Sequence, residues 1–324
     1  MSTMRVISTN FKKTMLSEAF EEYHIKNKIC NLSSATIKNY REGYERFAKV
    51  IGSDMLCEDV TVKIVDLFTA KLIDEGLKAA SVNHYLRSIR SFLYWCMAEG
   101  YIQQFKIRLI KEPQPIKPTY SDTQIRLLIR EPIKQASFVE WRCWAMVCWF
   151  LATGNRAETA CNIKMGDISF ETREVQINRT KTNRAMILPL SNELAKILKK
   201  YIGMFRSHES DEEYLFCNVG NKKLTVNALK ISISKYNRKR GVNLTSLHAF
   251  RHTFAKNWIR NTGDVFKLQK ILGHKTLEMT RRYVNMFHDD LKHEYEKYCP
   301  LDRIKFAGNA KSAIDRRAKK SFKW

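Results

Sequence analysis

The segment HAFRHTFAKNWIR carries the first side chains whose types and spacing suit chemistry. Phe250, Phe254 and Trp258 recur every four residues, so on a helix they form one apolar stripe that faces a core. His248 and Arg251 stand three residues apart and lie together on another side of the same helix. An imidazole and a guanidinium near a helix N-terminus, which itself favours anions, outline a phosphate site. A solvated polar face gives the same short pattern, so this segment alone leaves both interpretations open.

Two further segments offer reactive side chains. In KLQKILGHKTLEMTRRYVNMF, Gly273 ends a predicted helix, His274 follows at once, and Tyr283 comes nine residues later beside two arginines. In ATGNRAET, Arg156 stands just after a very apolar helix, and Gly154 with its short turn lets the guanidinium project from the helix end. Without the other motifs, Tyr283 would be an ordinary tyrosine on a helix surface.

A β-hairpin is predicted upstream of these segments. EVQINRT and KTNRAMILPL alternate in polarity and are rich in β-branched residues, with a polar turn at 181–184 between them. The turn region carries the basic residues Arg179, Lys181 and Arg184. The hairpin therefore offers cations to an anionic partner.

Taken together, these motifs resemble the tyrosine recombinase family of phage integrases and Xer-type recombinases. The resemblance is carried by TGNR, a lysine in a β-hairpin, HAFRH, LGH and a downstream TRRY, and it spans about residues 119–300. The preceding helical segment is similar to the family's core-binding domain. Each motif is weak alone, but the order and spacing of several must coincide, which makes the combined signal strong.

The resemblance implies a phosphate-binding set of four residues. Arg156 and Arg251 match the family arginines that hold the scissile phosphate, and bidentate guanidinium contacts suit its non-bridging oxygens. His248 matches the first family histidine and His274 the second, which is tryptophan in some members. Both imidazoles are suited to donate to phosphate oxygens or to move protons near neutral pH.

The resemblance also implies the nucleophile and the acid. Tyr283 matches the tyrosine that attacks the phosphate and forms a 3′-phosphotyrosine, which conserves the phosphodiester energy in the protein–DNA bond. Lys181 matches the hairpin lysine that protonates the leaving 5′ oxygen. Arg179 and Arg184 are nearby rivals, but only lysine readily gives up a proton, so the two arginines are taken as DNA contacts.

One position departs from the family pattern, and two tyrosines compete for the nucleophile role. Family members commonly have an acid three residues after the first arginine, where this chain has Thr159, with Glu158 one residue earlier. Support of Arg156 or of the hairpin is therefore expected to differ in detail. Tyr295 and Tyr298 lack a basic neighbourhood and fit the apolar stripe of a last predicted helix at 288–298.

Residues 1–108, which precede these motifs, are predicted to form a four-helix, SAM-like core-DNA-binding bundle. Apolar side chains recur at helical spacing in LSSATIKNYREGYERFAKVIG and in KAASVNHYLRSIRSFLYWCM, with two more helices at about 14–27 and 61–75. The polar side of the KAAS helix supplies four candidate DNA contacts: Lys78, Asn83, Arg87 and Arg90. A solvated polar face is an equally good interpretation of each of them.

A proline cluster separates this bundle from the motifs. Pro113, Pro115 and Pro118 predict a linker at 109–119, followed by a mainly α catalytic domain at 120–300 with one small sheet and a basic tail at 301–324. Ser121 and Gln124 form a capping box that starts a helix. Further helices are predicted at about 138–152, which is unusually apolar, and at 191–205, 225–240, 248–260, 264–272 and 276–285.

The charge of the chain indicates a polyanionic partner. The 324 residues carry a formal net charge of +24, and residues 1–110, with 16 basic and 12 acidic side chains, account for only +4 of it. The stronger positive field therefore belongs to the part that holds the motifs. Nucleic acid is the partner that such an excess fits best, although charge alone does not distinguish DNA from RNA.

Other classes of site and location find little support. The longest apolar run, 144–152, is too short to span a membrane, and no secretory signal is present, so a cytoplasmic protein is expected. No pair of the eight cysteines has CxxC spacing, and they are expected to be free thiols. His248 and His252 have an i, i+4 zinc spacing without the glutamate of HExxH, so neither a metal nor another cofactor is expected.

The sequence therefore predicts a site-specific DNA recombinase, with integrase or excisionase activity of a phage or mobile element. Its expected partner is double-stranded DNA, bound by a homotetramer on two sites. Three alternatives remain: a type IB topoisomerase-like enzyme with the same strand-cleavage chemistry, a DNA-binding protein without catalysis, and a basic RNA-binding protein.

Overall fold

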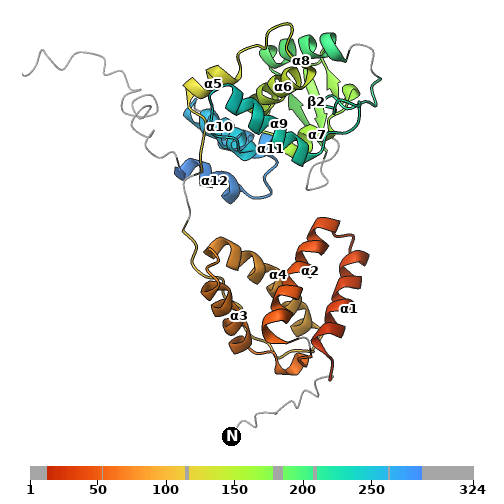
Figure 1. Ribbon diagram of the computed structural model, residues 1–324, viewed down its shortest axis with the longest axis vertical. Helices are drawn as coiled ribbons and strands as arrows, with labels where there is room; N and C mark the ends of the chain where they lie inside the picture. Colours follow the sequence, from red (N-terminus) through yellow and green to blue (C-terminus); the bar gives the residue numbers. More distant parts are fainter. Residues whose placement is uncertain are drawn as a thin grey trace, which may run out of the picture. The chain divides into compact units, whose positions relative to one another are not determined.

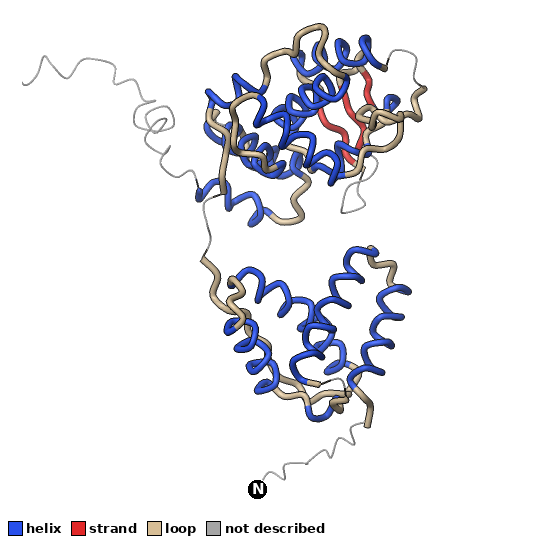
Figure 2. The backbone as a smooth tube through the Cα atoms, viewed as in Figure 1, coloured by secondary structure: helices blue, strands red, loops and turns tan. Residues whose placement is uncertain are grey.

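The computed structural model describes residues 13–52, 54–113, 117–177, 185–206, 210–261 and 263–286; in the last helix, side chains are described for 277–281 and 283. The chain divides into two compact units between Pro115 and Ile116. Both units are mainly helical, and a single small sheet lies in the second (Figures 1 and 2). This confirms the fold class predicted from the sequence.

The first unit is a helical bundle. Its described elements are α1 (Leu16–Ile29), α2 (Ser34–Ile51), the short 3-10 helix η1 (Cys57–Asp59), α3 (Val62–Asp74) and α4 (Ala79–Ala98). The apolar stripes of the four α-helices meet in one core, in which Phe20 and Phe47 make edge-to-face contacts with Phe92 and Phe68. A Cβ on Gly43 would lie 2.5 Å from that of Ser88, so glycine lets α2 and α4 pack closely.

The second unit is built around one helix that is buried on all sides. α5 (Asp122–Leu128) begins with the predicted capping box: the Ser121 hydroxyl accepts from the Gln124 amide, and the Gln124 side chain accepts from the Ser121 amide. α6 (Phe138–Thr153) is buried throughout 141–150. It packs against α8 (Asn192–Phe205), α9 (Val226–Lys239) and α10 (Leu247–Arg260), as Figure 1 shows. The prediction that this apolar helix forms the centre of a core is confirmed.

The sheet has three antiparallel strands in the order β1 (Ile168–Ser169), β2 (Glu174–Ile177) and β3 (Met186–Pro189). Val175 pairs with Leu188, and both side chains are buried while their strand neighbours face outward. The predicted pairing of two hairpin strands is therefore confirmed. β1 was not predicted, because two residues are too few to show alternation. Arg179, Lys181 and Arg184 lie outside the described residues.

The described part of the second unit also contains three short α-helices, α7 (Ala157–Asn162), α11 (Val265–Leu272) and α12 (Leu277–Met286), and the 3-10 helix η2 (Met165–Asp167). α12 packs against α10 and α11, where a small apolar cluster encloses Tyr283. None of the described helices combines the length and apolar character needed to cross a membrane. The predicted helix at 288–298 and the tail at 301–324 lie outside the described residues.

Candidate active site

Arg251 forms the floor of the site. It lies on α10, one residue after Phe250, which is fully buried in the main core, and its own side chain is only 6% exposed. Nη1 donates to the Gly154 carbonyl at 3.0 Å and Nη2 to the Leu272 carbonyl at 2.8 Å. These carbonyls stand at the C-terminal ends of α6 and α11, where carbonyls lack helical partners and carry partial negative charge. The guanidinium is thus fixed by the two helix ends.

Gly154 makes this close approach possible. It ends α6 in the left-handed conformation, with φ +62°, and an added Cβ would lie 2.5 Å from the Phe254 ring and 2.9 Å from Leu272. Only glycine meets both requirements without strain. The turn that follows brings Arg156 to the N-terminus of α7.

The guanidinium of Arg156 also lies near the end of α11, close to Arg251. Its side chain is half-buried, and Nη1 is 4.0 Å from the position that a Cβ on Gly273 would take. The pKa of Arg251 is lowered to about 10, mainly by burial and then by the positive charge of Arg156. Among the residues that the structure describes, neither guanidinium has a carboxylate at ion-pair distance. Two neighbouring cations without an acidic partner favour the binding of an anion.

Tyr283 reaches this site from α12. The side chain is 7% exposed, and its ring packs with Ala255, Leu268 and Leu272. Burial raises the pKa of Tyr283, while the charge and hydrogen bonding of Arg251 act in the opposite direction. The phenolic oxygen therefore lies beside the buried guanidinium, although α10 and α12 are separate helices.

His274 holds the other side of the tyrosine ring. It follows Gly273, which ends α11 with φ +62°, and its ring is parallel to that of Tyr283 with centroids 6.1 Å apart. Its Nδ1 is 2.8 Å from Oγ1 of the fully buried Thr280. Burial, followed by the charges of Arg251 and Arg156, lowers the pKa of His274 to about 4. The imidazole is therefore neutral at pH 7, with Nδ1 engaged.

His248 lies in the first turn of α10 and is exposed. Its charge lowers the pKa of His252, one helical turn further on, after the larger effect of burial. The structure thus brings five of the six predicted catalytic residues to one region. Lys181 is the exception because it lies outside the described residues.

Sequence reasoning missed two contributors to this site. His252 was placed near His248 and Arg251 on the same helix and weighed as a zinc ligand, but no contact with the tyrosine was predicted; its Nδ1 is 2.9 Å from the Tyr283 hydroxyl. Its place directly after Arg251 and one turn after His248 was the available signal. Thr280 was not considered, although it precedes Tyr283 by three residues and therefore shares a face of α12 with it.

The predicted DNA contacts in the first unit fall into two groups. Lys78 and Arg87 are exposed and Arg90 is half-buried, on or next to α4. Asn83, in contrast, is 2% exposed, and its amide exchanges two 3.0 Å hydrogen bonds with the backbone of Ile110. Asn83 therefore fixes the start of the linker to α4, and the structure gives no support to a DNA contact at this residue.

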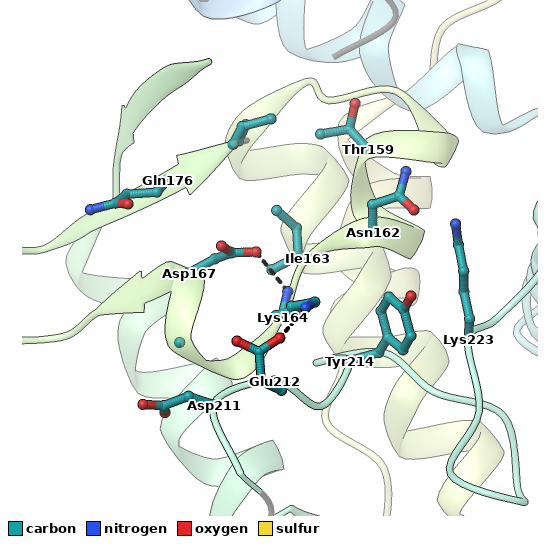
Figure 3. A pocket seen from close by; sticks show the side chains of 12 residues that line it. Thr159, Asn162, Ile163, Lys164, Asp167, Gln176, Asp211, Glu212, Tyr214 and Lys223 are labelled. Atoms are coloured by element: carbon teal, nitrogen blue, oxygen red, sulfur yellow. Dashed lines mark hydrogen bonds and ion pairs between the residues drawn. The ribbon is translucent and has the colours of Figure 1, made fainter. Parts of the chain in front are cut away.

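Two cavities border the sheet. A cleft of about 800 Å³ runs between β3 and α11 and reaches Gly273 and His274. The other, of about 610 Å³, lies beside α7 and β2 and includes the buried Thr159 at the position where the family commonly has an acid (Figure 3). In that cavity Lys164 pairs with Glu212, and its backbone amide donates to Asp167. None of the predicted catalytic residues that the structure describes lines this cavity, and its mixed charges make it a poor phosphate site.

Two family models match the chain, one in each unit. A profile described as "Phage integrase family" matches residues 121–289, and "Phage integrase, N-terminal SAM-like domain" matches 18–100. The chain belongs to the phage integrase family. It is a tyrosine-type site-specific recombinase, as the sequence motifs predicted.

Relatives and solved structures agree in length and fold. The chain is 26% identical to tyrosine recombinase XerC of Oceanobacillus iheyensis over 83% of this chain and 92% of the relative. It is also 26% identical to tyrosine recombinase XerA of Pyrococcus furiosus, over 90% of this chain and 98% of the relative. A lambda integrase dimer bound to a COC′ core site has the same fold, with TM-score 0.67, 17% identity and coverage of 83% and 95%. A Tn1549 transposon integrase in complex with a circular intermediate DNA also has this fold, with a TM-score of 0.69 and 16% identity. The match covers 87% of this chain and 100% of that one.

Proposed function

We propose that this protein cleaves and rejoins duplex DNA at specific sites through a 3′-phosphotyrosine formed on Tyr283. The observation that carries the proposal is the position of the Tyr283 hydroxyl, buried beside the guanidinium of Arg251 and near that of Arg156. A phosphodiester bound by the two arginines brings its phosphorus within reach of that oxygen. Covalent catalysis of this kind divides strand exchange into two transesterifications.

Each surrounding residue receives a role in this reaction. Arg156 and Arg251 bind the non-bridging oxygens and stabilise the charge that develops on them in the transition state. His248 and His274 donate further hydrogen bonds to the phosphate. His274 is suited to this because its Nδ1 is engaged by Thr280, which leaves Nε2 for the ligand.

Lys181 is proposed as the acid that protonates the leaving 5′ oxygen. It lies in the segment that joins β2 to β3, and β3 begins beside the site: Met186 Sδ is 3.9 Å from the position of a Cβ on Gly273. This position of β3 supports the assignment of the acid to a side chain of the connection. Arg179 and Arg184 are proposed to contact the DNA backbone.

Double-stranded DNA is the proposed partner. The formal charge of +24 favours a polyanion, and the lambda and Tn1549 integrases that have this fold are described as bound to DNA. Lys78, Arg87 and Arg90 are proposed to contact phosphates from the first unit. A homotetramer on two sites is proposed by analogy with a lambda integrase tetramer bound to a Holliday junction, which has the fold with TM-score 0.66. The protein is proposed to act in the cytoplasm.

The biological setting is proposed to be integration or excision of a phage or mobile element. The lambda and Tn1549 integrases support this setting, and dimer resolution is the alternative outcome. Locating the ends of any element that surrounds the gene, and testing those DNA ends as substrates, distinguishes the two.

The decisive experiment is Tyr283→Phe on duplex DNA selected by binding from a random-sequence pool. We expect unchanged binding and complete loss of the covalent protein–DNA adduct, scored on denaturing gels. Tyr295→Phe and Tyr298→Phe serve as matched controls that keep the adduct. An adduct formed at the normal rate by Tyr283→Phe would exclude Tyr283 as the nucleophile.

A further inference from the structure

His252 touches the atom that attacks the phosphate in the proposed reaction. Its Nδ1 lies 2.9 Å from the Tyr283 hydroxyl, and the ring centroids are 5.5 Å apart at an angle of 46°. The imidazole is half-buried on α10, so the contact crosses from one helix to another. The roles given to the four phosphate-binding residues, to the nucleophile Tyr283 and to Lys181 leave His252 without one.

The two histidines beside Tyr283 contact it in different ways. His274 stacks parallel to the ring and directs Nδ1 to Thr280, whereas His252 directs Nδ1 to the phenolic oxygen. Arg251 is also close to that oxygen, but a guanidinium has no acceptor. His252, whose Nδ1 is at hydrogen-bond distance from the hydroxyl, can accept its proton.

His252 is in the protonation state that a base requires. Burial lowers the pKa of His252 to about 4, and the charges of His248, Lys117 and Arg251, which face it from α10 and from the segment before α5, act in the same direction. The ring is neutral at pH 7, with one donor and one acceptor nitrogen. With the proton on Nε2, the hydrogen bond runs from Tyr283 to His252.

We propose that His252 is the general base for Tyr283: it takes the phenolic proton during strand cleavage and returns it during rejoining. This inference rests on the proposed function of Tyr283 as the nucleophile. It adds a catalytic residue that the sequence motifs did not assign.

The proton and bond changes balance in both directions. In cleavage, the Tyr283 O–H bond breaks and its proton moves to Nδ1, the phenolic oxygen bonds to phosphorus, and the bond from phosphorus to the 5′ oxygen breaks. The departing 5′ oxygen takes a proton from the general acid, for which Lys181 is proposed. In rejoining, the oxygen of a 5′ hydroxyl bonds to phosphorus and gives its proton to the deprotonated Lys181. The bond from phosphorus to the phenolic oxygen breaks, and that oxygen takes the proton held by His252.

Bound DNA should make His252 a stronger base. In the free protein, burial and then the charges of His248, Lys117 and Arg251 disfavour the imidazolium of His252, which makes the ring a weak base. A phosphodiester at Arg156 and Arg251 brings a negative charge to the same region and favours the imidazolium. Proton transfer is therefore promoted when the scissile phosphate is in place, which limits ionisation of Tyr283 in its absence.

The test is His252→Asn, because the asparagine amide can occupy nearly the position of Nδ1 and hydrogen-bond to Tyr283 but cannot take its proton. With the full chain and the duplex selected from the random pool, we expect single-turnover adduct formation to fall by roughly 10²-fold or more, as for loss of a general base. DNA affinity should stay unchanged. The remaining rate should rise with pH, because Tyr283 must then lose its proton to solvent. His24→Asn, in the first unit, is the control for loss of an imidazole.

A second substrate separates the base from the acid. A 5′-bridging phosphorothiolate at the cleaved position supplies a leaving group that needs no acid. It should restore cleavage by Lys181→Ala and leave the defect of His252→Asn in place. Restoration of His252→Asn to the wild-type rate would assign His252 to the leaving-group side and overturn the proposal.

Failure of this inference is distinguishable from failure of the proposed function. If His252→Asn forms the adduct at the wild-type rate with an unchanged pH profile, while Tyr283→Phe forms none, His252 is not the base and Tyr283 remains the nucleophile. If wild-type protein forms no adduct through Tyr283, the proposed function itself fails. Loss of DNA binding or of the folded state by His252→Asn would assign it a structural role and also contradict the proposal.

Discussion

Asn83 in the first unit and Arg251 in the second are polar side chains on amphipathic helices, and both are almost completely buried, with exposed fractions of 2% and 6%. From the sequence, Asn83 was a candidate DNA contact, with a solvated polar face as the equal alternative, and the family resemblance implied that Arg251 holds the scissile phosphate. Both instead hydrogen-bond to backbone atoms from distant parts of the chain: Ile110 for Asn83, and Gly154 and Leu272 for Arg251.

The two residues differ in the hydrogen-bonding capacity and charge that they keep after those bonds are made. Both ends of the Asn83 amide are engaged by the linker segment at 110–112. Arg251 uses two of its five donors on the helix ends, and its charge faces Tyr283 beside Arg156. A buried polar residue can thus fix the fold or prepare a site, depending on whether bonding capacity and charge remain available.

The largest expected effect is that of Arg251→Lys on chemistry. An ammonium cannot bridge both helix ends and contact the phosphate in the same geometry. We expect covalent adduct formation to fall by roughly 10²–10³-fold, the usual cost of removing a preorganised donor. Arg260→Lys, at the end of the same helix, is the control. A merely few-fold loss for Arg251→Lys would show that the fixed geometry is unimportant.

Gly154, which lets Arg251 reach the end of α6, should show the next largest effect, on the free energy of unfolding. Gly154→Ala should reduce the free energy of unfolding by about 1–2 kcal/mol for the left-handed backbone alone. The overlap with the Phe254 ring adds to this loss. Gly203→Ala, in α8 with nothing within 4 Å of the new Cβ, should stabilise by about 0.5–1 kcal/mol. Urea unfolding of both variants measures the contrast, and equal effects would contradict it.

Asn83→Ala should separate fold from chemistry. It leaves the Ile110 amide and carbonyl without their partners, at an expected cost of about 1–3 kcal/mol in the free energy of unfolding. The rate of adduct formation from saturating DNA should stay near that of the wild type. A strong loss of that rate, with stability unchanged, would give Asn83 the kind of role assigned to Arg251.

Acid should weaken the second unit through the site histidines. In the folded chain, the pKa values of His252 and His274 are lowered from 6.5 to about 4, mainly by burial. Between these values the unfolded chain binds more protons, so stability rises with pH. The contribution of these neutral histidines to stability is fully present above about pH 6.5 and is lost as pH falls towards 4. His274→Gln should reduce this dependence in thermal melts, and an unchanged slope would argue against it.

The smallest effect on stability is expected for Arg87→Gln. Arg87 and Glu112 form an ion pair of 3.7 Å, and the arginine side chain is 53% exposed. Exposed pairs contribute at most about 1 kcal/mol to stability. If Arg87 contacts a DNA phosphate as proposed, the salt dependence of binding should lose about one unit of slope. A large loss of stability would instead class Arg87 with Asn83.

The helices and the hairpin strands were predictable because their signals are local. Apolar spacing in α2 and α4, the Ser121–Gln124 capping box, and the alternation across β2 and β3 are properties of a few consecutive residues. The candidate site was predictable from separate motifs that occur in a fixed order. β1 was not predictable, because two residues are too few to show alternation. The contact between His252 and Tyr283 was not either, because the two residues stand 31 positions apart on different helices. The spacing of Thr280 does not show that its hydroxyl meets His274.

By itself, the sequence determined the helical class, the excess of positive charge, and the reactive side chains with their order along the chain. Only the tertiary structure decided that Arg251 is held by two helix ends, that His252 rather than His274 meets the phenolic oxygen, and that Asn83 is turned towards the linker. The physical reason is that helical periodicity fixes the side of a helix on which a residue lies. Which distant backbone or ring covers that side, and hence its hydrogen bonds and its pKa, depends on packing between elements that lie far apart in the chain.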